Sequence, residues 1–191
     1  MIKARSDCKF YIVTKRIDRF DQCIPNDWNT GYDNVYISST VENQSMADYR
    51  LPILLESPVK HKAICVEPLL EDIDLSKYLS TRQIHHVIIG GESGKKARVC
   101  NYKWVRHIVD DCNRYYVPVC FKQTGSNFVD EYGTTNHYSR PSQIPTAATR
   151  YGYLSSFRLD RLDKLLDETE EYSKNAKLLL DTIRLASRGI S

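Results

Sequence analysis

Residues 85–98 read "HHVIIGGESGKKAR", in which the apolar run "HHVIIGG" (85–91) is followed by a glutamate and several basic residues. Short β-branched runs that stop at glycine are typical of buried strands. Four more runs of this kind occur along the chain: "FYIVT" (10–14), "NVYISST" (34–40), "KAICVE" (62–67) and "VPVCFKQ" (117–123). Together, the five runs predict the strands of one sheet.

Segments with helical character lie between these runs. "NQSMADYRLPILLE" follows the run at 34–40 and has Asn43 in the position of a helix N-cap. "YKWVRHIVDDCNRYY" follows the run that begins at residue 85. The predicted strands start 23 to 32 residues apart, which is the length of a β-α unit. This alternation predicts a parallel sheet with helices packed on it.

Alternation inside the strands separates two faces of the predicted sheet. One face is bulky and apolar, and the other is small in its middle and charged at the strand ends, as Cys65, Glu67, Cys120 and Lys122 show. An open doubly wound sheet has helices on both faces, so both faces are apolar. We therefore predict an α/β fold, a partial (β/α) TIM-like barrel with about five parallel strands, over residues 1–123.

The rest of the chain has a different composition. Residues 124–157 are rich in Tyr, Ser, Thr and Pro, which predicts an irregular excursion. Residues 158–191 show apolar positions in steps of three and four, which predicts a C-terminal amphipathic helix. Packing of this helix on the domain is favoured over a coiled-coil dimer, because Thr169 and Ala176 fall in the seam.

Neither common phosphate-binding motif fits residues 85–98. A P-loop needs Ser or Thr after its lysine, but Lys95 is followed by Lys96. The dinucleotide fingerprint fails because Gly90 and Gly91 are adjacent. Glycines at a strand end let a ligand approach the backbone closely, and this is our interpretation of Gly90 and Gly91.

Charged and polar residues follow every predicted strand, and the ends of parallel strands share one edge of the sheet. Working residues of (β/α) barrels lie at that edge, which favours a ligand site over a ring of ion pairs that closes the barrel top. The catalytic candidates are Glu92, Glu67 and Lys122. The candidate cofactor-binding residues are Thr14, Lys15, Arg16, Thr40, Glu42, Asn43, Gly90, Gly91, Ser93 and Gln123.

Composition excludes several other classes. The six cysteines form no C-x-x-C pair and no histidine pair has ligand spacing, so no metal site is predicted. No apolar run approaches the roughly 20 residues that span a bilayer, which favours a cytoplasmic protein without a membrane partner. The net charge of +3 makes nucleic acid a minor candidate partner, through the tyrosines and arginines of residues 124–157.

Six stretches in order resemble one known family, over about residues 9–125. They are "VTKRIDRF" (13–20), "VYISSTVENQSMADYRLPILLESP" (35–58), "CVEPLLEDIDL" (65–75), "VIIGGESGKKAR" (87–98), "WVRHIVDDC" (104–112) and "VPVCFKQTG" (117–125). The family is phage-encoded, radical-SAM-like and of unknown function.

This resemblance implies a partial (β/α) barrel and, in full-length members, an iron–sulfur cluster with S-adenosylmethionine. In those members a cysteine-rich loop precedes the first matching stretch, and this chain begins only a few residues before that stretch. We expect the C-terminal portion of the barrel, in a truncated or natural short form, which lines a cofactor site. Cluster binding and activity are not expected of this chain alone, whereas S-adenosylmethionine is retained as a candidate ligand.

The first strand of a partial sheet leaves an edge that must be covered or paired. An N-terminal barrel portion on a separate chain, a second copy of this chain, or the C-terminal helix could each cover it. The alternative to the enzyme-fragment hypothesis is a non-catalytic module that binds a nucleoside or nucleic acid at the same strand ends.

Overall fold

The computed structural model describes residues 2–146, 150–159, 162 and 164. The chain divides into two compact units, Met1–Arg158 and Leu159–Ser191, and the fold described below is that of the first. Apart from a few residues, the C-terminal helix predicted over 158–191 lies outside the described part.

Five parallel strands form the main sheet. They are β1 (Phe10–Thr14), β2 (Val35–Thr40), β3 (His61–Val66), β4 (Ile84–Gly90) and β6 (Val119–Gln123). Their order in space is their order in the chain, β1-β2-β3-β4-β6, and each begins and ends within two residues of its predicted run. The predicted parallel sheet is therefore confirmed.

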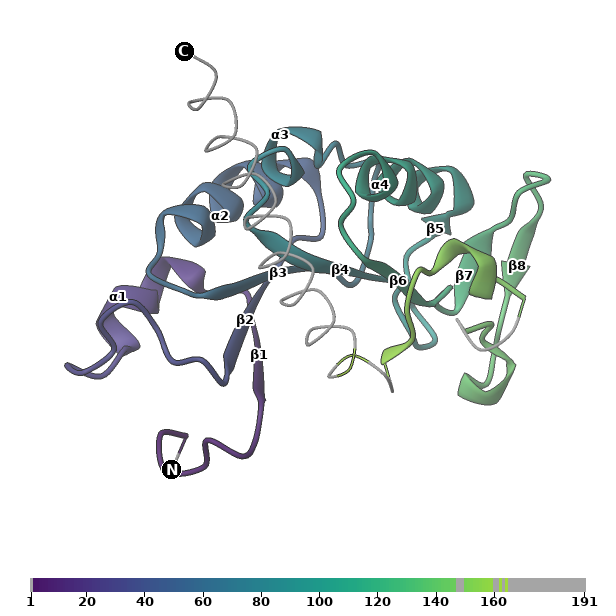
Figure 1. The fold of residues 1–191 in the computed structure, drawn as a ribbon. Helices are drawn as coiled ribbons and strands as arrows, with labels where there is room; N and C mark the ends of the chain where they lie inside the picture. The colour runs from purple at the N-terminus through teal and green to yellow at the C-terminus, as the bar shows by residue number, and fades with distance from the viewer. Residues whose placement is uncertain (1, 147–149, 160–161, 163, 165–191) are drawn as a thin grey trace, which may run out of the picture. The chain divides into compact units, whose positions relative to one another are not determined.

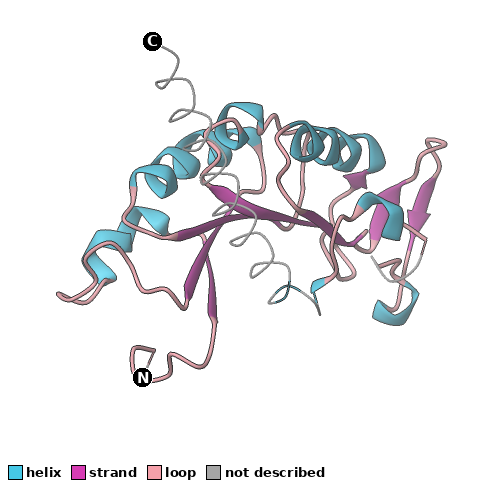
Figure 2. Ribbon diagram, in the orientation of Figure 1, coloured by secondary structure: helices cyan, strands magenta, loops and turns pink. Residues whose placement is uncertain are grey.

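Sequential order places the connecting helices on a single face, because parallel crossovers are right-handed. The longer helices α2 (Gln44–Glu56) and α4 (Tyr102–Arg114), with the short α3 (Ser76–Leu79), all cover one face of the sheet (Figures 1 and 2). The short η1 (Ile17–Arg19) and α1 (Phe20–Cys23) follow β1. Asn43 caps α2 as predicted, since its Oδ1 accepts a 2.8 Å hydrogen bond from the Met46 N–H.

The hydrophobic core lies between this helical layer and the sheet. Ile64 and Val66 on β3 and Val87 and Ile89 on β4 are fully buried there, together with Leu51 of α2 and other core side chains. Side chains of opposite parity point to the other face, here called the inner face. It carries mostly small and polar residues, namely Ser38, Thr40, Ala63, Cys65, His86 and Cys120, with the larger Tyr36 and Ile88 among them. The two-faced pattern predicted from the sequence is present.

The two edges of the sheet differ. At β6, the Ser156 and Ser155 hydroxyls accept hydrogen bonds from the Val119 and Phe121 N–H groups, at 2.8 and 2.9 Å. At β1, no further strand of the described chain pairs, and Ile12 and Val13 are 39% and 58% exposed. The sheet of the described residues is thus a five-stranded α/β sheet that does not close into a barrel.

A second, three-stranded sheet joins β5 (Cys100–Asn101), β7 (Asn127–Val129) and β8 (Thr135–His137). Two 3-10 turns follow, η2 (Pro141–Gln143) and η3 (Gly152–Leu154). The prediction of an irregular segment over 124–157 missed β7 and β8, because strands of three residues show too little alternation. The turn between them was visible as "DEYG" (130–133): the Asp130 carboxylate accepts from two N–H groups, and Gly133 has a φ of +82°.

Candidate functional site

Three residues from different strands meet at the carboxyl edge of the sheet. Glu67 directly follows β3, and Lys122 and Gln123 end β6. The Lys122 Nζ lies 3.2 and 3.1 Å from the two Glu67 carboxylate oxygens, and the Gln123 Nε2 donates to Glu67 Oε1 at 3.0 Å. We call these residues the Glu67 cluster. The contact spans three strands, because β4 lies between β3 and β6.

Gly90, at the end of β4, makes this contact possible. A Cβ at Gly90 would lie 2.8 Å from Glu67 Oε1, so the Glu67 side chain occupies the space that a side chain at 90 would fill. At Gly91 a Cβ would lie 2.1 Å from the Thr124 carbonyl oxygen. The close approach that we had assigned to a ligand at these two glycines is made by the protein itself.

Glu42, after β2, forms a second group of charges at the same edge. Its carboxylate is 2.8 Å from the Arg50 Nη1 and 3.2 Å from the Lys15 Nζ. Arg50 also donates to the Thr40 carbonyl oxygen at 2.8 Å, which ties α2 to the end of β2. Burial alone would raise the pKa of Glu42, but the hydrogen bonds from Lys15 and Arg50 outweigh burial and lower it.

Glu92 is held within its own loop. Arg98 donates to both of its carboxylate oxygens, at 2.7 and 2.9 Å, and the Arg98 backbone N–H donates a further bond of 2.8 Å. The hydrogen bond from the Arg98 side chain is the main reason why the pKa of Glu92 falls to about 2, and the charge of Lys15 contributes. A carboxylate with this pKa remains ionised at neutral pH, so it suits binding better than proton transfer.

The remaining predicted residues serve local structure. The Thr14 Oγ1 accepts from the Arg16 N–H at 2.9 Å, and the Arg16 side chain pairs with Asp18 at 3.1 Å. Asn43 caps α2, and Ser93 is exposed in the loop after β4. The structure therefore joins Glu67 to Lys122 and Gln123, and Glu42 to Lys15, but leaves Thr14, Arg16 and Ser93 outside both groups.

The inner face holds two buried polar groups that sequence reasoning missed. Ser38 and His86 lie in register on either side of Ala63, and their relative exposures are 7% and 2%. Within the described part of the chain, neither the Ser38 hydroxyl nor the His86 Nδ1 has a hydrogen-bond partner. Buried polar groups are nearly always satisfied, so an unpartnered pair of this kind is unusual. In the sequence, polar residues at alternate positions of the β2 and β4 strands indicated these two groups.

Burial controls the ionisation of the inner face. It lowers the pKa of His86 to about 4, with help from the charge of His85, so this imidazole is neutral at physiological pH. Burial also raises the pKa of the Cys65 thiol, and the nearby Glu67 carboxylate adds to the effect. Cys65 is therefore a neutral thiol beside the Glu67 cluster rather than a reactive thiolate.

The cysteines do not gather into a metal-binding set. All six fall within the described residues, and four of them are buried: Cys65, Cys100, Cys112 and Cys120. No group of three His, Cys, Asp or Glu side chains in the described part could hold a metal ion. Burial raises the pKa of Cys100 to about 12, which opposes the thiolate that a cluster needs. These residues do not fit an iron–sulfur cluster.

Among the described helices, none has both the length and the apolar character that crossing a bilayer requires.

A family model described as "Protein of unknown function (DUF5131)" matches residues 1–177. The chain belongs to this family. The match extends beyond residues 9–125, where the sequence resemblance was recognised, and takes in the small second sheet of this DUF5131 chain. No curated protein and no solved structure matched the chain. The family description assigns no activity, so the unknown-function part of the resemblance is confirmed and its radical-SAM part is left as a proposal.

Alanine at the two adjacent glycines should have different effects. We expect Gly90→Ala to change the free energy of unfolding by less than about 1 kcal/mol, because the flexible end of Glu67 can move aside. Gly91→Ala should cost about 1–3 kcal/mol or more, because the Thr124 backbone cannot move as easily. Urea unfolding of both variants measures the change in the free energy of unfolding. Equal losses of stability would contradict the assignment of a flexible side chain beside Gly90 and of backbone beside Gly91.

Proposed function

We propose that this DUF5131 chain binds a polar small molecule against the inner face of its sheet, with the Glu67 cluster at the rim. One observation carries the proposal. A carboxylate and an ammonium, Glu67 and Lys122, meet at the strand ends on the parity that also carries the buried, unsatisfied Ser38 and His86. The Gln123 amide joins them where the register of β4 and β6 shifts. A sheet face that served packing alone would be apolar at these positions.

The donor set indicates the class of ligand. Glu67 accepts hydrogen bonds from an ammonium or from ribose hydroxyls, and Lys122 donates to a carboxylate or a phosphate. The neutral imidazole of His86 and the hydroxyl of Ser38 each have a free bonding position for a ligand heteroatom. An amino-acid-like or nucleoside ligand carries groups of both kinds.

S-adenosylmethionine is the member of this class that the family resemblance implies. It has an ammonium, a carboxylate and a ribose diol, and these groups match Glu67, Lys122 and Gln123. When bound, it supplies a reactive sulfonium whose bonds to carbon can be broken. The chain's own residues bind and orient: Glu67 and Lys122 exchange their mutual contact for contacts with the ligand, and Glu92 holds the adjoining loop through Arg98.

The binding test is calorimetric titration of the chain with S-adenosylmethionine. We expect saturable binding that Glu67→Gln and Lys122→Met each weaken by about tenfold or more, because each removes a charged hydrogen-bond partner. Lys95→Met is the matched control, since Lys95 is an exposed lysine in the loop after β4. Its affinity should equal that of the unmodified chain.

Two outcomes would count against this proposal. One is the absence of binding. The other is binding that Glu67→Gln and Lys122→Met leave unchanged, which would show that the Glu67 cluster does not recognise the ligand. Titration with a single-stranded oligonucleotide tests the nucleic-acid alternative. Salt-sensitive binding that depends on Lys95 and Lys96, and not on Glu67, would favour that alternative.

We infer, second, that the β1 edge takes a strand from another polypeptide, either an N-terminal barrel portion on a separate chain or a second copy. An open apolar groove of about 830 Å³ lies beside β1 on the helix side of the sheet. Its lining includes Ile2, Ile12, Ile17, Phe20, Ile24, Trp28 and Ile37. A strand added at β1 would continue the sheet, and a helix connected to it would fill the groove.

Sedimentation tests the case in which the second copy is the partner. The chain should associate as its concentration rises, and Val13→Lys should keep it monomeric, because lysine on an edge strand opposes pairing. Tyr116→Lys is the control at a residue that is 91% exposed elsewhere on the surface. If the chain stays monomeric at every concentration, a second copy of the chain is not the partner that pairs with β1.

A further inference from the structure

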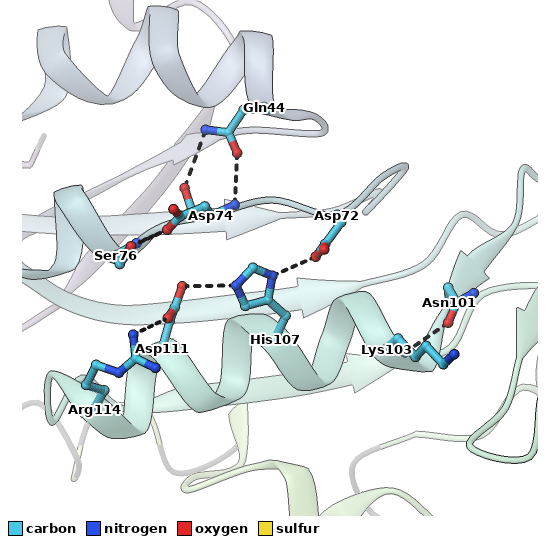
Figure 3. Close-up of polar contacts among 9 residues, drawn as sticks. All are labelled: Gln44, Asp72, Asp74, Ser76, Asn101, Lys103, His107, Asp111 and Arg114. Atoms are coloured by element: carbon cyan, nitrogen blue, oxygen red, sulfur yellow. Dashed lines mark hydrogen bonds and ion pairs between the residues drawn. The ribbon is translucent and has the colours of Figure 1, made fainter.

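His107 on α4 lies between two carboxylates that come from different elements (Figure 3). Its Nδ1 donates to Asp72 Oδ1 at 2.8 Å, and its Nε2 faces Asp111 Oδ2 at 3.9 Å. Asp72 belongs to the loop between β3 and α3, whereas Asp111 is one turn further along α4. The imidazole therefore bridges the loop and the helix.

Asp111 is a buried acid whose carboxylate also accepts a hydrogen bond from the backbone of Leu75, at the end of the loop. Its side chain is 3% exposed, and within the described residues its Oδ2 has no hydrogen-bond partner. Arg114 approaches only the other oxygen, at 3.5 Å. Burial raises the pKa of Asp111, and the charge of His107 opposes that rise. A buried carboxylate of this kind is costly unless a cation stays beside it.

The geometry distinguishes the two protonation states of His107. Both ring nitrogens face carboxylate oxygens, and an imidazole donates through both nitrogens only when it is protonated. The charged groups around it are Asp72 and Asp74 from the loop, and Asp111 and Arg114 from α4. The hydrogen bond to Asp72 is the main cause that raises the pKa of His107, against the effect of burial.

The loop that His107 holds, residues 67–75, begins at the candidate site. Glu67 is its first residue, and the Leu69 and Leu70 N–H groups donate to the carbonyl oxygens of Gly90 and Glu42, at 2.9 and 3.0 Å. Its far end is fixed by Gln44 of α2, whose side chain accepts from the Asp74 N–H at 2.8 Å (Figure 3). A change at His107 therefore acts on a segment that carries Glu67.

We propose that His107 is a pH-sensitive latch: its protonated ring joins α4 to the β3–α3 loop through Asp72 and at the same time faces the buried Asp111, and its deprotonation weakens this joint. This extends the proposed function by a control on the Glu67 side of the site, but the latch itself needs no ligand. It can therefore be tested whether or not S-adenosylmethionine binds.

The direction of the effect follows from linkage. Because the pKa of His107 is raised in the folded chain, its stabilisation is complete below the unfolded value of about 6.5. It is lost as the pH rises through the folded value. Above that pH both Asp72 and Asp111 lose the charge of the imidazolium, and Asp111 keeps only Arg114 beside it, so the loop should open more readily on the alkaline side.

Hydrogen–deuterium exchange of residues 67–75, corrected for intrinsic rates, measures the opening without any ligand. We expect exchange at least about threefold faster at about pH 8.5 than at about pH 6. His107→Gln should abolish this dependence, because glutamine keeps a donor for Asp72 but does not titrate. His137→Gln, at a histidine on β8 far along the chain, should behave as the unmodified protein.

Asp72→Asn is a second variant that is expected to fold, because the Asp72 side chain is 56% exposed. It should lower the pKa of His107, read by NMR titration of the imidazole, and shift the exchange midpoint to lower pH. Exchange of residues 67–75 that does not change with pH, or that keeps its pH dependence in His107→Gln, would overturn the latch. A failure of S-adenosylmethionine to bind would not by itself contradict the proposed latch.

Discussion

Glu67 reaches Lys122 and Gln123 because the strand between them ends in a residue without a side chain. β4 separates β3 from β6, and Gly90 leaves the space into which the Glu67 carboxylate extends. Gln123 then donates to both Glu67 and the Gly91 carbonyl oxygen, at 3.0 and 2.6 Å, which fixes the end of β6 against that of β4. One missing side chain thus decides whether three strand ends form one site.

The sequential strand order explains why the inner face of the sheet can carry polar residues. The crossover helices α2, α3 and α4 cover the same face, and the bulky apolar residues of β3 and β4 pack against them there (Figure 2). The inner face is free to carry Ser38, Cys65 and His86, and two of these have buried polar atoms without partners in the described chain. The strand order that builds the core therefore also leaves room for polar residues on the inner face.

Local pattern predicted most of the fold and less of the site. Runs of β-branched residues placed the five parallel strands, and Asn43 marked the start of α2, because these signals lie within a few residues of one another. The partners of Glu67 and His107 could not be predicted, since contacts 55 and 35 residues apart depend on the completed sheet and on α4. The glycines at 90 and 91 were recognised as close approaches, but one sequence does not show that protein atoms fill them.

Zero-length carbodiimide coupling tests the central contact most directly, because it joins only a carboxylate and an amine that touch. The account predicts a linked peptide pair that contains Glu67 and Lys122, whose charged atoms are 3.1 Å apart. Asp48 and Lys77, 2.8 Å apart on the helical side, serve as the internal control for the reagent. Coupling of Asp48 to Lys77 with no link between Glu67 and Lys122 would contradict the assembly of the site across β4.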